Sequence, residues 1–334
     1  MKILSENNID RTAWAEFVKA HPKGNVFQTP EMYEVYAHTE HTIPLVVAVE
    51  EHNEIVGILL AQIITNGDSL ASWLTARSII IGGPLIKDER EDILYYLINA
   101  YKRLLPKKVI YSEIRPIYDI ADIATSLKSI RWKRKGHYNL LMSLNKTPEE
   151  LFEQMHKERR RNVNQAIKTG LVFREVIERS DVRAIVELIR KTYERKHVPI
   201  SYLDMFEEVH EQMKQYAHFF ASYTSDGIMI AGEVRLCYKD LIYAWFAGSD
   251  EDYFKLRPND FTMWNVICWG AAHGYKLLDF GGGGEPGVPY GVRDYKLKYG
   301  CEMYDYGRYV YAHRPISLWA GTIAYKLYHR IKGK

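Results

Sequence analysis

Residues 277–284 read Leu-Leu-Asp-Phe-Gly-Gly-Gly-Gly, and residues 291–300 read Gly-Val-Arg-Asp-Tyr-Lys-Leu-Lys-Tyr-Gly. The run 277–280 predicts a strand, and the four glycines predict a loop whose backbone can approach a ligand closely. Backbone N–H groups in such a loop can hold an anion or an oxyanion. The alternative is a flexible turn between a strand and a helix. The pattern GxxxxGK[ST] is absent, so a nucleotide P-loop is not predicted.

The segments before this stretch have the pattern of a mixed α/β domain. Strands are predicted over 219–223, 228–238 and 241–246, with turn residues between them. Pro258 begins a predicted helix that extends to residue 273, and the strand 277–280 follows it. The predicted order is therefore three strands, a helix and a fourth strand.

The first half of the chain shows the same order about 170 residues earlier. Strands are predicted over 43–49, 55–64, 70–74, 78–81 and 108–114, and a helix over 88–104. Two tandem acyltransferase domains of the GNAT kind are expected, over 1–145 and 146–314. The closing stretch 315–334 predicts a basic amphipathic helix, which we expect to pack back on the first domain; the alternative is a membrane surface.

The composition excludes several classes of protein. With 45 basic and 42 acidic residues the formal net charge is +3, which excludes a polycation. Cys237, Cys268 and Cys301 lie far apart, so neither a disulfide framework nor a zinc site is expected, and a reducing compartment fits best. The histidines are dispersed without HExxH, so no metal enzyme is predicted. No apolar run approaches about 18 residues, so no membrane-spanning helix is predicted.

Five further segments accompany the glycine-rich stretch, in chain order. They are Val26-Phe27-Gln28-Thr29-Pro30-Glu31-Met32, Gly83-Pro84, Glu158-Arg159-Arg160-Arg161-Asn162-Val163, Lys191-Thr192-Tyr193-Glu194-Arg195 and Tyr243-Ala244-Trp245-Phe246-Ala247-Gly248-Ser249. Together with residues 279–300 they resemble the Fem (FemABX) aminoacyltransferases over nearly the whole chain. Only two short helices are predicted over 181–216, so the chain resembles the members that have no coiled-coil arm.

The resemblance implies a tandem GNAT fold and a reaction without a bound cofactor. The donor would be an aminoacyl-tRNA, and the acceptor an amine on the stem peptide of a peptidoglycan precursor, carried by a nucleotide or a lipid. The reaction is aminolysis of an ester, whose oxyanion and leaving oxygen need cationic or N–H partners. We expect a cytoplasmic protein, in peripheral contact with the inner face of the membrane if the acceptor is lipid-linked.

The resemblance also implies the catalytic residues. Lys296 corresponds to the family's functional lysine, and we expect its ammonium to stabilise the oxyanion or the tRNA 3′ end; the alternative is a surface lysine. Asp279 lies at the predicted strand end, where its carboxylate would accept a proton or fix the lysine. A structural ion pair is the alternative for Asp279.

Substrate-binding residues are implied in the same way. Arg195 would bind the phosphates or stem peptide of the precursor, or else be an ordinary cation at a helix end. Tyr243 and Trp245 alternate on one strand, where they would line a peptide channel or belong to the core. Tyr36 stands where armless members carry a lysine for the diphosphate of the precursor, and Met32 stands where the family has Trp. The remaining expected contacts to substrate are Tyr295, Gly281 and Gly282.

A basic run on the predicted helix 147–168 is a weaker candidate. Arg159, Arg160 and Arg161 occupy about one turn, where they would contact tRNA phosphates or form a solvated helix face. Two alternative functions remain. One is an N-acyltransferase that uses an acyl-CoA or acyl-carrier donor on a cell-surface sugar or polysaccharide, although no Arg/Gln-x-x-Gly-x-Gly/Ala motif is present. The other is a non-catalytic protein that binds the precursor.

Overall fold

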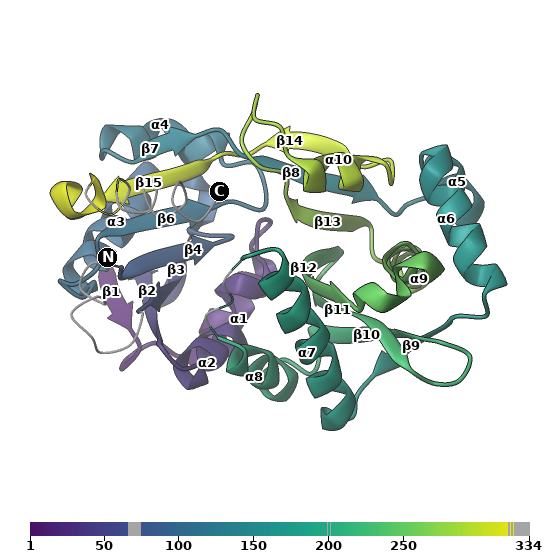
Figure 1. Ribbon diagram of the computed structural model, residues 1–334. Helices are drawn as coiled ribbons and strands as arrows, with labels where there is room; N and C mark the ends of the chain where they lie inside the picture. The colour runs from purple at the N-terminus through teal and green to yellow at the C-terminus, as the bar shows by residue number, and fades with distance from the viewer. Residues whose placement is uncertain (66–74, 199, 201, 320, 322, 324–334) are drawn as a thin grey trace. The chain divides into compact units, whose positions relative to one another are not determined.

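The computed structural model in Figure 1 describes residues 1–334 except 66–74, 199, 201, 320, 322 and 324–334. The chain forms two compact units. Unit 1 contains Met1–Gly136 and Tyr306–Lys334, and unit 2 contains His137–Asp305. The predicted strand 70–74 and most of the predicted helix 315–334 lie outside the described residues.

Unit 1 is built on one mixed sheet. Its strands are β1 (Lys2–Ser5), β2 (Thr42–Glu51), β3 (Glu54–Ile64), β4 (Arg77–Ile81), β5 (Leu85–Ile86), β6 (Tyr111–Arg115), β7 (Lys133–Lys135) and β15 (Arg308–Ala312). The strand order is β1-β2-β3-β4-β6-β15-β7, with β5 paired to β3. β4 and β6 are parallel, whereas the other paired strands are antiparallel.

The helices that accompany this sheet include α1 (Arg11–Ala20), α2 (Pro30–His38), α3 (Glu91–Leu104) and α4 (Ala121–Ser129). α2 begins at Pro30, because the Thr29 side chain accepts from the Met32 amide and a proline suits the first turn. α3 buries Ile93, Leu94, Leu97 and Ile98, whose spacing gives the helix one apolar face. Short 3₁₀ turns occupy η1 (Val26–Gln28) and η3 (Lys87–Glu89).

Unit 2 repeats this plan. Its strands are β8 (Tyr138–Ser143), β9 (Val172–Val176), β10 (Ala217–Tyr223), β11 (Met229–Tyr238), β12 (Leu241–Ser249), β13 (Leu277–Gly282) and β14 (Glu302–Asp305), in the order β14-β8-β13-β12-β11-β10-β9. Its helices are α5 (Pro148–Glu153), α6 (Lys157–Lys168), α7 (Arg179–Arg195), α8 (Asp204–Gln212), α9 (Pro258–Ala272) and α10 (Gly291–Leu297), with the 3₁₀ helix η4 (Glu251–Leu256) before α9. Among the described residues only α8 lies between α7 and β10.

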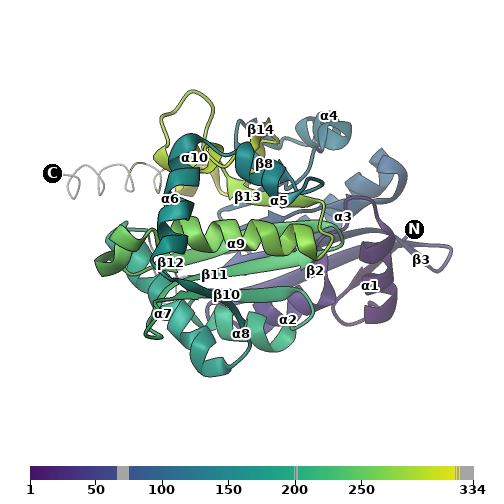
Figure 2. The ribbon, with the colours of Figure 1, turned by 90° about the vertical axis from the view of Figure 1, so that its right-hand side faces the viewer.

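α7 and α9 cover opposite faces of the unit 2 sheet. α7 lies on the face of Gly232 and Gly248, and a Cβ at Gly248 would meet the Ile189 nitrogen at 2.4 Å. The face of Cys237, Ile242 and Leu278 packs on α9. Figure 2 shows α9 lying along the strands, with α6 beside it. The two glycines therefore let α7 approach the sheet closely.

The two units exchange one strand each. β1 and β9 begin 170 residues apart, at Lys2 and Val172, and so do β8 and β15, at Tyr138 and Arg308. β8 pairs with β13 and β14 of unit 2, whereas β15 returns to pair with β6 and β7 of unit 1. The predicted domains, 1–145 and 146–314, place β8 in the first domain and β15 in the second. In the structure β8 belongs to unit 2 and β15 to unit 1. The buried side chains of Leu140, Leu141 and Met142 explain why β8 occupies an internal position in the second sheet.

Candidate active site

Unit 2 contains a parallel strand pair that separates part-way along its length. β12 and β13 pair only from Leu241↔Leu277 to Tyr243↔Asp279, although β12 continues to Ser249. The corresponding strands of unit 1, β4 and β6, pair over all five residues, from Arg77↔Tyr111 to Ile81↔Arg115. Ligands of open α/β sheets bind beyond the carboxyl ends of parallel strands. The point where β12 and β13 separate is therefore the candidate active site.

Lys296 lies at this point. It extends from α10, and its Nζ donates to the carbonyl oxygens of Phe280 at 2.5 Å and Gly282 at 3.0 Å. Burial lowers the pKa of Lys296 to about 8, while the nearby Asp279 carboxylate favours its charged form. Near neutral pH the site therefore holds a half-buried ammonium group directed at the end of β13.

Asp279 is fully buried on β13, two residues before Gly281, whose φ is positive. Its Oδ1 accepts from the Gly281 amide at 2.7 Å, and its Oδ2 accepts from Asn139 Nδ2 at 3.3 Å. Burial raises the pKa of Asp279 to about 6, an effect that these two hydrogen bonds and the Lys296 charge reduce. Asp279 is thus a buried counter-charge for Lys296.

Tyr243 and the two glycines predicted to contact substrate lie beside these residues. The register pairs Tyr243 with Asp279, so the two side chains share a face of the sheet. Gly281 has φ +75°, and a Cβ there would lie 3.7 Å from the Tyr243 hydroxyl. At Gly282 a Cβ would meet His137 Nε2 at 2.8 Å. The structure therefore brings together Asp279, Lys296, Tyr243 and both glycines.

Arg293 fastens the rest of the glycine-rich loop. Its guanidinium donates to the carbonyl oxygens of Gly283 at 3.2 Å, Glu285 at 3.2 Å and Val288 at 2.7 Å. A planar guanidinium with five donors suits such divergent acceptors better than an ammonium does. The sequence analysis did not select Arg293, although its position three residues before Lys296 on one helix places both side chains on the same face.

A buried ion pair on β11 lies behind the site. Glu233 and Arg235 point to the α9 face of the sheet, and their side chains form an ion pair. Burial raises the pKa of Glu233, and the Arg235 charge lowers the pKa of Lys296. Sequence reasoning missed this pair, although two charged residues at the inward-facing positions of an apolar strand were a signal for it.

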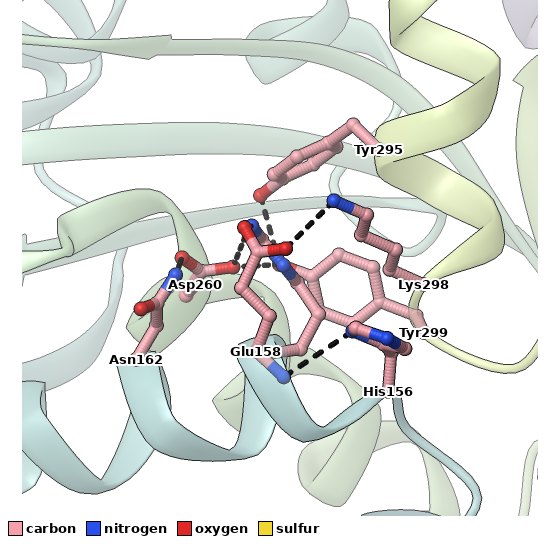
Figure 3. Close-up of polar contacts among 8 residues, drawn as sticks. His156, Glu158, Asn162, Asp260, Tyr295, Lys298 and Tyr299 are labelled. Atoms are coloured by element: carbon pink, nitrogen blue, oxygen red, sulfur yellow. Dashed lines mark hydrogen bonds and ion pairs between the residues drawn. The ribbon is translucent and has the colours of Figure 1, made fainter.

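A second buried network joins α6, α9 and α10 (Figure 3). Asp260 accepts from Arg159 Nη1 at 2.5 Å, from Asn162 Nδ2 at 2.9 Å and from the Tyr299 hydroxyl at 2.6 Å. The Tyr295 and Tyr299 hydroxyls are 2.8 Å apart, and the Arg159 guanidinium lies 4.8 Å from the centre of the Tyr295 ring. Burial raises the pKa of both tyrosines, so they remain neutral hydrogen-bonding groups.

The same network reaches the surface through Glu158 (Figure 3). The Glu158 carboxylate binds Arg159 and also Lys298 Nζ, at 2.7 Å, and these two cations lower the pKa of Glu158 to about 2. The His156 amide donates to the Lys298 carbonyl at 2.8 Å. Arg159 is therefore committed to an internal network, and of the three predicted tRNA contacts only Arg160, half-buried, and Arg161, exposed, remain on the surface of α6.

Two further predicted substrate contacts lie on α7 and β12. Arg195 ends α7, where its guanidinium lies 3.5 Å from Glu251 and 5.0 Å from the centre of the Phe254 ring. Trp245 is the extra residue of a β-bulge, since Val234 pairs with Phe246 and Arg235 with Ala244. It packs on Phe206, with ring centres 5.3 Å apart.

Tyr36 belongs to unit 1. Its side chain is buried on α2, with 4% of its surface exposed, and its carbonyl accepts from the Thr42 hydroxyl at 2.5 Å. Among the described residues no group of three or more His, Cys, Asp or Glu side chains could hold a metal ion. Within the same described ranges, no helix combines the length and hydropathy needed to cross a bilayer.

Comparison with known proteins agrees with this geometry. Residues 152–297, which contain the whole candidate site, match the family model of an acetyltransferase (GNAT) domain. The solved structure of FemX superposes with a TM-score of 0.75 and 16% identity, covering 96% of this chain and 100% of FemX. The chain has a FemX-like tandem GNAT fold. The predicted fold class is thereby confirmed.

Two more distant structures share the tandem GNAT fold. L-PGS from Bacillus licheniformis has a TM-score of 0.59 and 12% identity, over 94% of this chain and 96% of that one. A tandem GNAT protein from the clavulanic acid biosynthesis pathway has a TM-score of 0.58 and 8% identity, over 93% and 98%. Comparison with curated proteins found no match to the sequence.

Proposed function

We propose that this protein is an aminoacyltransferase that moves an amino acid from aminoacyl-tRNA to an amine on the stem peptide of a peptidoglycan precursor. The observation that carries the proposal is the Lys296 ammonium, held between the carbonyls of Phe280 and Gly282 where β12 and β13 separate. The fold of this chain is similar to that of FemX. Another solved structure that is similar to this chain is named as a domain of a putative lysylphosphatidylglycerol synthetase.

In the proposed reaction the acceptor amine attacks the ester carbon of the aminoacyl group. A C–N bond forms, the C–O bond to the tRNA ribose breaks, the amine loses a proton and the ribose oxygen gains one. The Lys296 ammonium exchanges its carbonyl partners for the oxyanion or the leaving oxygen, whose charge it stabilises. Asp279 acts through its charge, because a carboxylate beside Lys296 keeps the amine protonated at neutral pH.

The tRNA part of the proposal is supported by the exposed cations of α6. Lys157 and Arg161 lie four residues apart and are exposed, and Arg160 is half-buried beside them. Cations on one helix surface suit the phosphate backbone of RNA and would make binding depend on salt concentration. The precursor is carried by a nucleotide or a lipid in this proposal, and a lipid carrier would bring the protein to the inner face of the membrane.

An acyl-CoA or acyl-carrier N-acyltransferase is the second candidate, and the GNAT family model favours it. The segment that precedes α9 favours an aminoacyl-tRNA donor instead. Residues 250–257, which precede α9, contain no glycine. They therefore lack the Gly-x-Gly/Ala loop whose N–H groups hold a pyrophosphate at a helix N-terminus.

A donor test separates these functions. The protein is incubated with radiolabelled aminoacyl-tRNAs or with labelled acetyl-CoA, each with peptidoglycan precursors. We expect label to move from tRNA to precursor, and Lys296→Met to reduce turnover at least tenfold without changing the thermal unfolding temperature. Lys276→Met, which removes a surface lysine paired with Asp240, is the matched control.

Each other result of the donor test has a definite meaning. Transfer from the thioester alone would move the protein to the second candidate. Normal turnover in Lys296→Met would remove Lys296 from the mechanism. Absence of transfer from both donors would contradict both enzyme proposals and favour a non-catalytic protein that binds the precursor.

A further inference from the structure

Unit 1 contains a cavity that the proposed function does not use. Its volume is about 770 Å³, and it opens between α1, the turn from β2 to β3, η3 and the first residues of α4. A volume of this size falls within the range of small-molecule sites, roughly 300–1,000 Å³. No lining residue belongs to β4 or β6, so the cavity is not the unit 1 counterpart of the site between β12 and β13.

The floor of the cavity is apolar. It is formed by Phe17, Ile55, Pro84, Ile86, Ile120 and Ile123. The four isoleucines are buried side chains of the unit 1 interior, so the floor is fixed by the core rather than by mobile surface groups. Such a floor accepts the methylene or aromatic part of a ligand and releases water from it.

The rim is acidic. It carries five carboxylates, Glu16, Glu54, Asp88, Glu89 and Asp122, against the two ammonium groups of Lys23 and Lys87. Both lysines are already paired: Lys23 with Asp122 and, at 3.5 Å, with Glu89, and Lys87 with Glu54 at 3.2 Å.

Two rim carboxylates have no cation of their own. Glu16 on α1 and Asp88 on η3 form no ion pair with any residue that the structure describes. An acidic excess of this kind attracts cations and repels phosphates and carboxylates. The cavity therefore rejects a nucleotide and suits a cation.

The walls of the cavity are preformed. His21 Nε2 lies 3.0 Å from the Ile86 carbonyl, and its Nδ1 accepts from the Lys23 amide at 3.1 Å, which ties the end of α1 to β5. These two bonds assign a neutral ring with the proton on Nε2. Asp88 and Glu89 have positive φ values of 54° and 56°, so the backbone of η3 is held in a conformation that residues other than glycine rarely adopt.

We propose that this cavity of unit 1 binds a primary alkylammonium ligand, with its apolar stem on the isoleucine floor and its ammonium group between Glu16 and Asp88. Such a group is found in free alkylamines and in lysyl side chains of peptides. The proposal is independent of the aminoacyl transfer proposed for unit 2.

The test uses n-octylammonium as the probe, with n-octanol and octanoate as matched neutral and anionic probes, all below their micelle concentrations. Binding is followed by NMR of isoleucine δ1-methyl groups in the full chain. We expect saturable shifts at Ile55, Ile86, Ile120 and Ile123 with octylammonium, binding at least tenfold weaker with octanol, and none with octanoate. A short lysine-containing peptide and its N-acetyl-lysine counterpart then distinguish a peptide side chain from a free amine.

The double variant Glu16→Gln/Asp88→Asn should weaken octylammonium at least tenfold while the methyl spectrum of the free protein stays unchanged. Glu153→Gln/Glu208→Gln removes the same charge from unit 2 and should leave the affinity unaltered. Equal affinity for octanol and octylammonium, tighter binding of octanoate, or shifts confined to methyl groups elsewhere would each overturn the proposal.

Discussion

Arg293 and Lys296 lie three residues apart on α10, and both donate to backbone carbonyls of the segment 280–288. Lys296 binds the carbonyls of Phe280 and Gly282, and Arg293 binds those of Gly283, Glu285 and Val288. One helix therefore holds the end of β13 and the loop after it through five charge-assisted hydrogen bonds. In the proposed mechanism the two cations have separate tasks: Arg293 fixes the loop, and Lys296 exchanges its carbonyl partners for those of a substrate.

Replacing Arg293 tests this division. Arg293→Met should reduce kcat at least tenfold with a smaller change in KM, because the loop that positions Lys296 loses three hydrogen bonds. Amide hydrogen exchange within residues 283–288 should become faster. Arg293→Lys should restore only part of kcat, since an ammonium cannot span three divergent carbonyls. Unchanged exchange in Arg293→Met would contradict the positioning role.

The charged form of Asp279 is expected to lower the free energy of unfolding at neutral pH. Burial raises its pKa in the folded state to about 6, from an ordinary value of 3.8, so the folded protein binds the proton more tightly than the unfolded chain does. Its contribution to stability is therefore lost as pH rises from about 4 to 6, and the charged form costs at most about 3 kcal/mol at neutral pH. Asp279→Asn should raise the free energy of unfolding by about 1–3 kcal/mol at pH 7.5 and by much less at pH 4.5.

Urea denaturation at both pH values measures this difference. The same variant should turn over more slowly at pH 7.5, because Lys296 loses the carboxylate that keeps it protonated. An equal gain in stability at both pH values would show that the effect of Asp279→Asn is not electrostatic.

The rate of aminoacyl transfer should depend on pH through the same two groups. Turnover at saturating substrate is expected to fall above about pH 8, where Lys296 loses its proton, and below about pH 6, where Asp279 gains one. Lys296→Arg should shift the alkaline limb upward, since a guanidinium stays protonated. Rates are measured from pH 5 to 9 after subtraction of the uncatalysed hydrolysis of the ester. An alkaline limb at the same pH in Lys296→Arg would assign that limb to another group.

The Arg159–Asp260 pair should contribute to stability rather than to RNA binding. Asp260→Asn leaves the buried Arg159 with only the half-buried Glu158 as a counter-charge, and the free energy of unfolding should fall by about 3 kcal/mol. Arg159→Met in the same background should restore part of the loss, which a double-mutant cycle in urea measures. Arg161→Met is the surface control, expected to change stability by less than about 0.5 kcal/mol. Simple additivity of the two buried substitutions would contradict a direct interaction.

The sequence predicts the order of elements and the glycine-rich site because both depend on local signals. Pro258 begins α9, and Asp279 and Lys296 meet because the strand, loop and helix that carry them are consecutive. Arg159 was harder to place, as its basic neighbours suggest a solvated face. Its spacing of four and seven residues from Val163 and Ala166, both buried, places it on the inner face of α6.

The strand exchange lies beyond local pattern. β8 follows β7 in the chain, and β15 follows β14, so each pair has the spacing of a hairpin. In the structure β7 and β15 belong to the sheet of unit 1, whereas β8 and β14 belong to the sheet of unit 2. Alternation of apolar residues indicates that a strand has a buried face, but not which sheet supplies the neighbours. The choice is made by contacts between residues far apart in the chain, such as Val310 with Glu113.

This exchange also determines when the protein can fold during its synthesis. β15 lies between β6 and β7, so the first unit lacks an internal strand until residues 308–312 have left the ribosome. Until then β6 has an open edge, which is a template for wrong pairing with other nascent chains. A chain that contained only one of the two repeats would have an incomplete sheet, so neither repeat is expected to fold when it is expressed on its own.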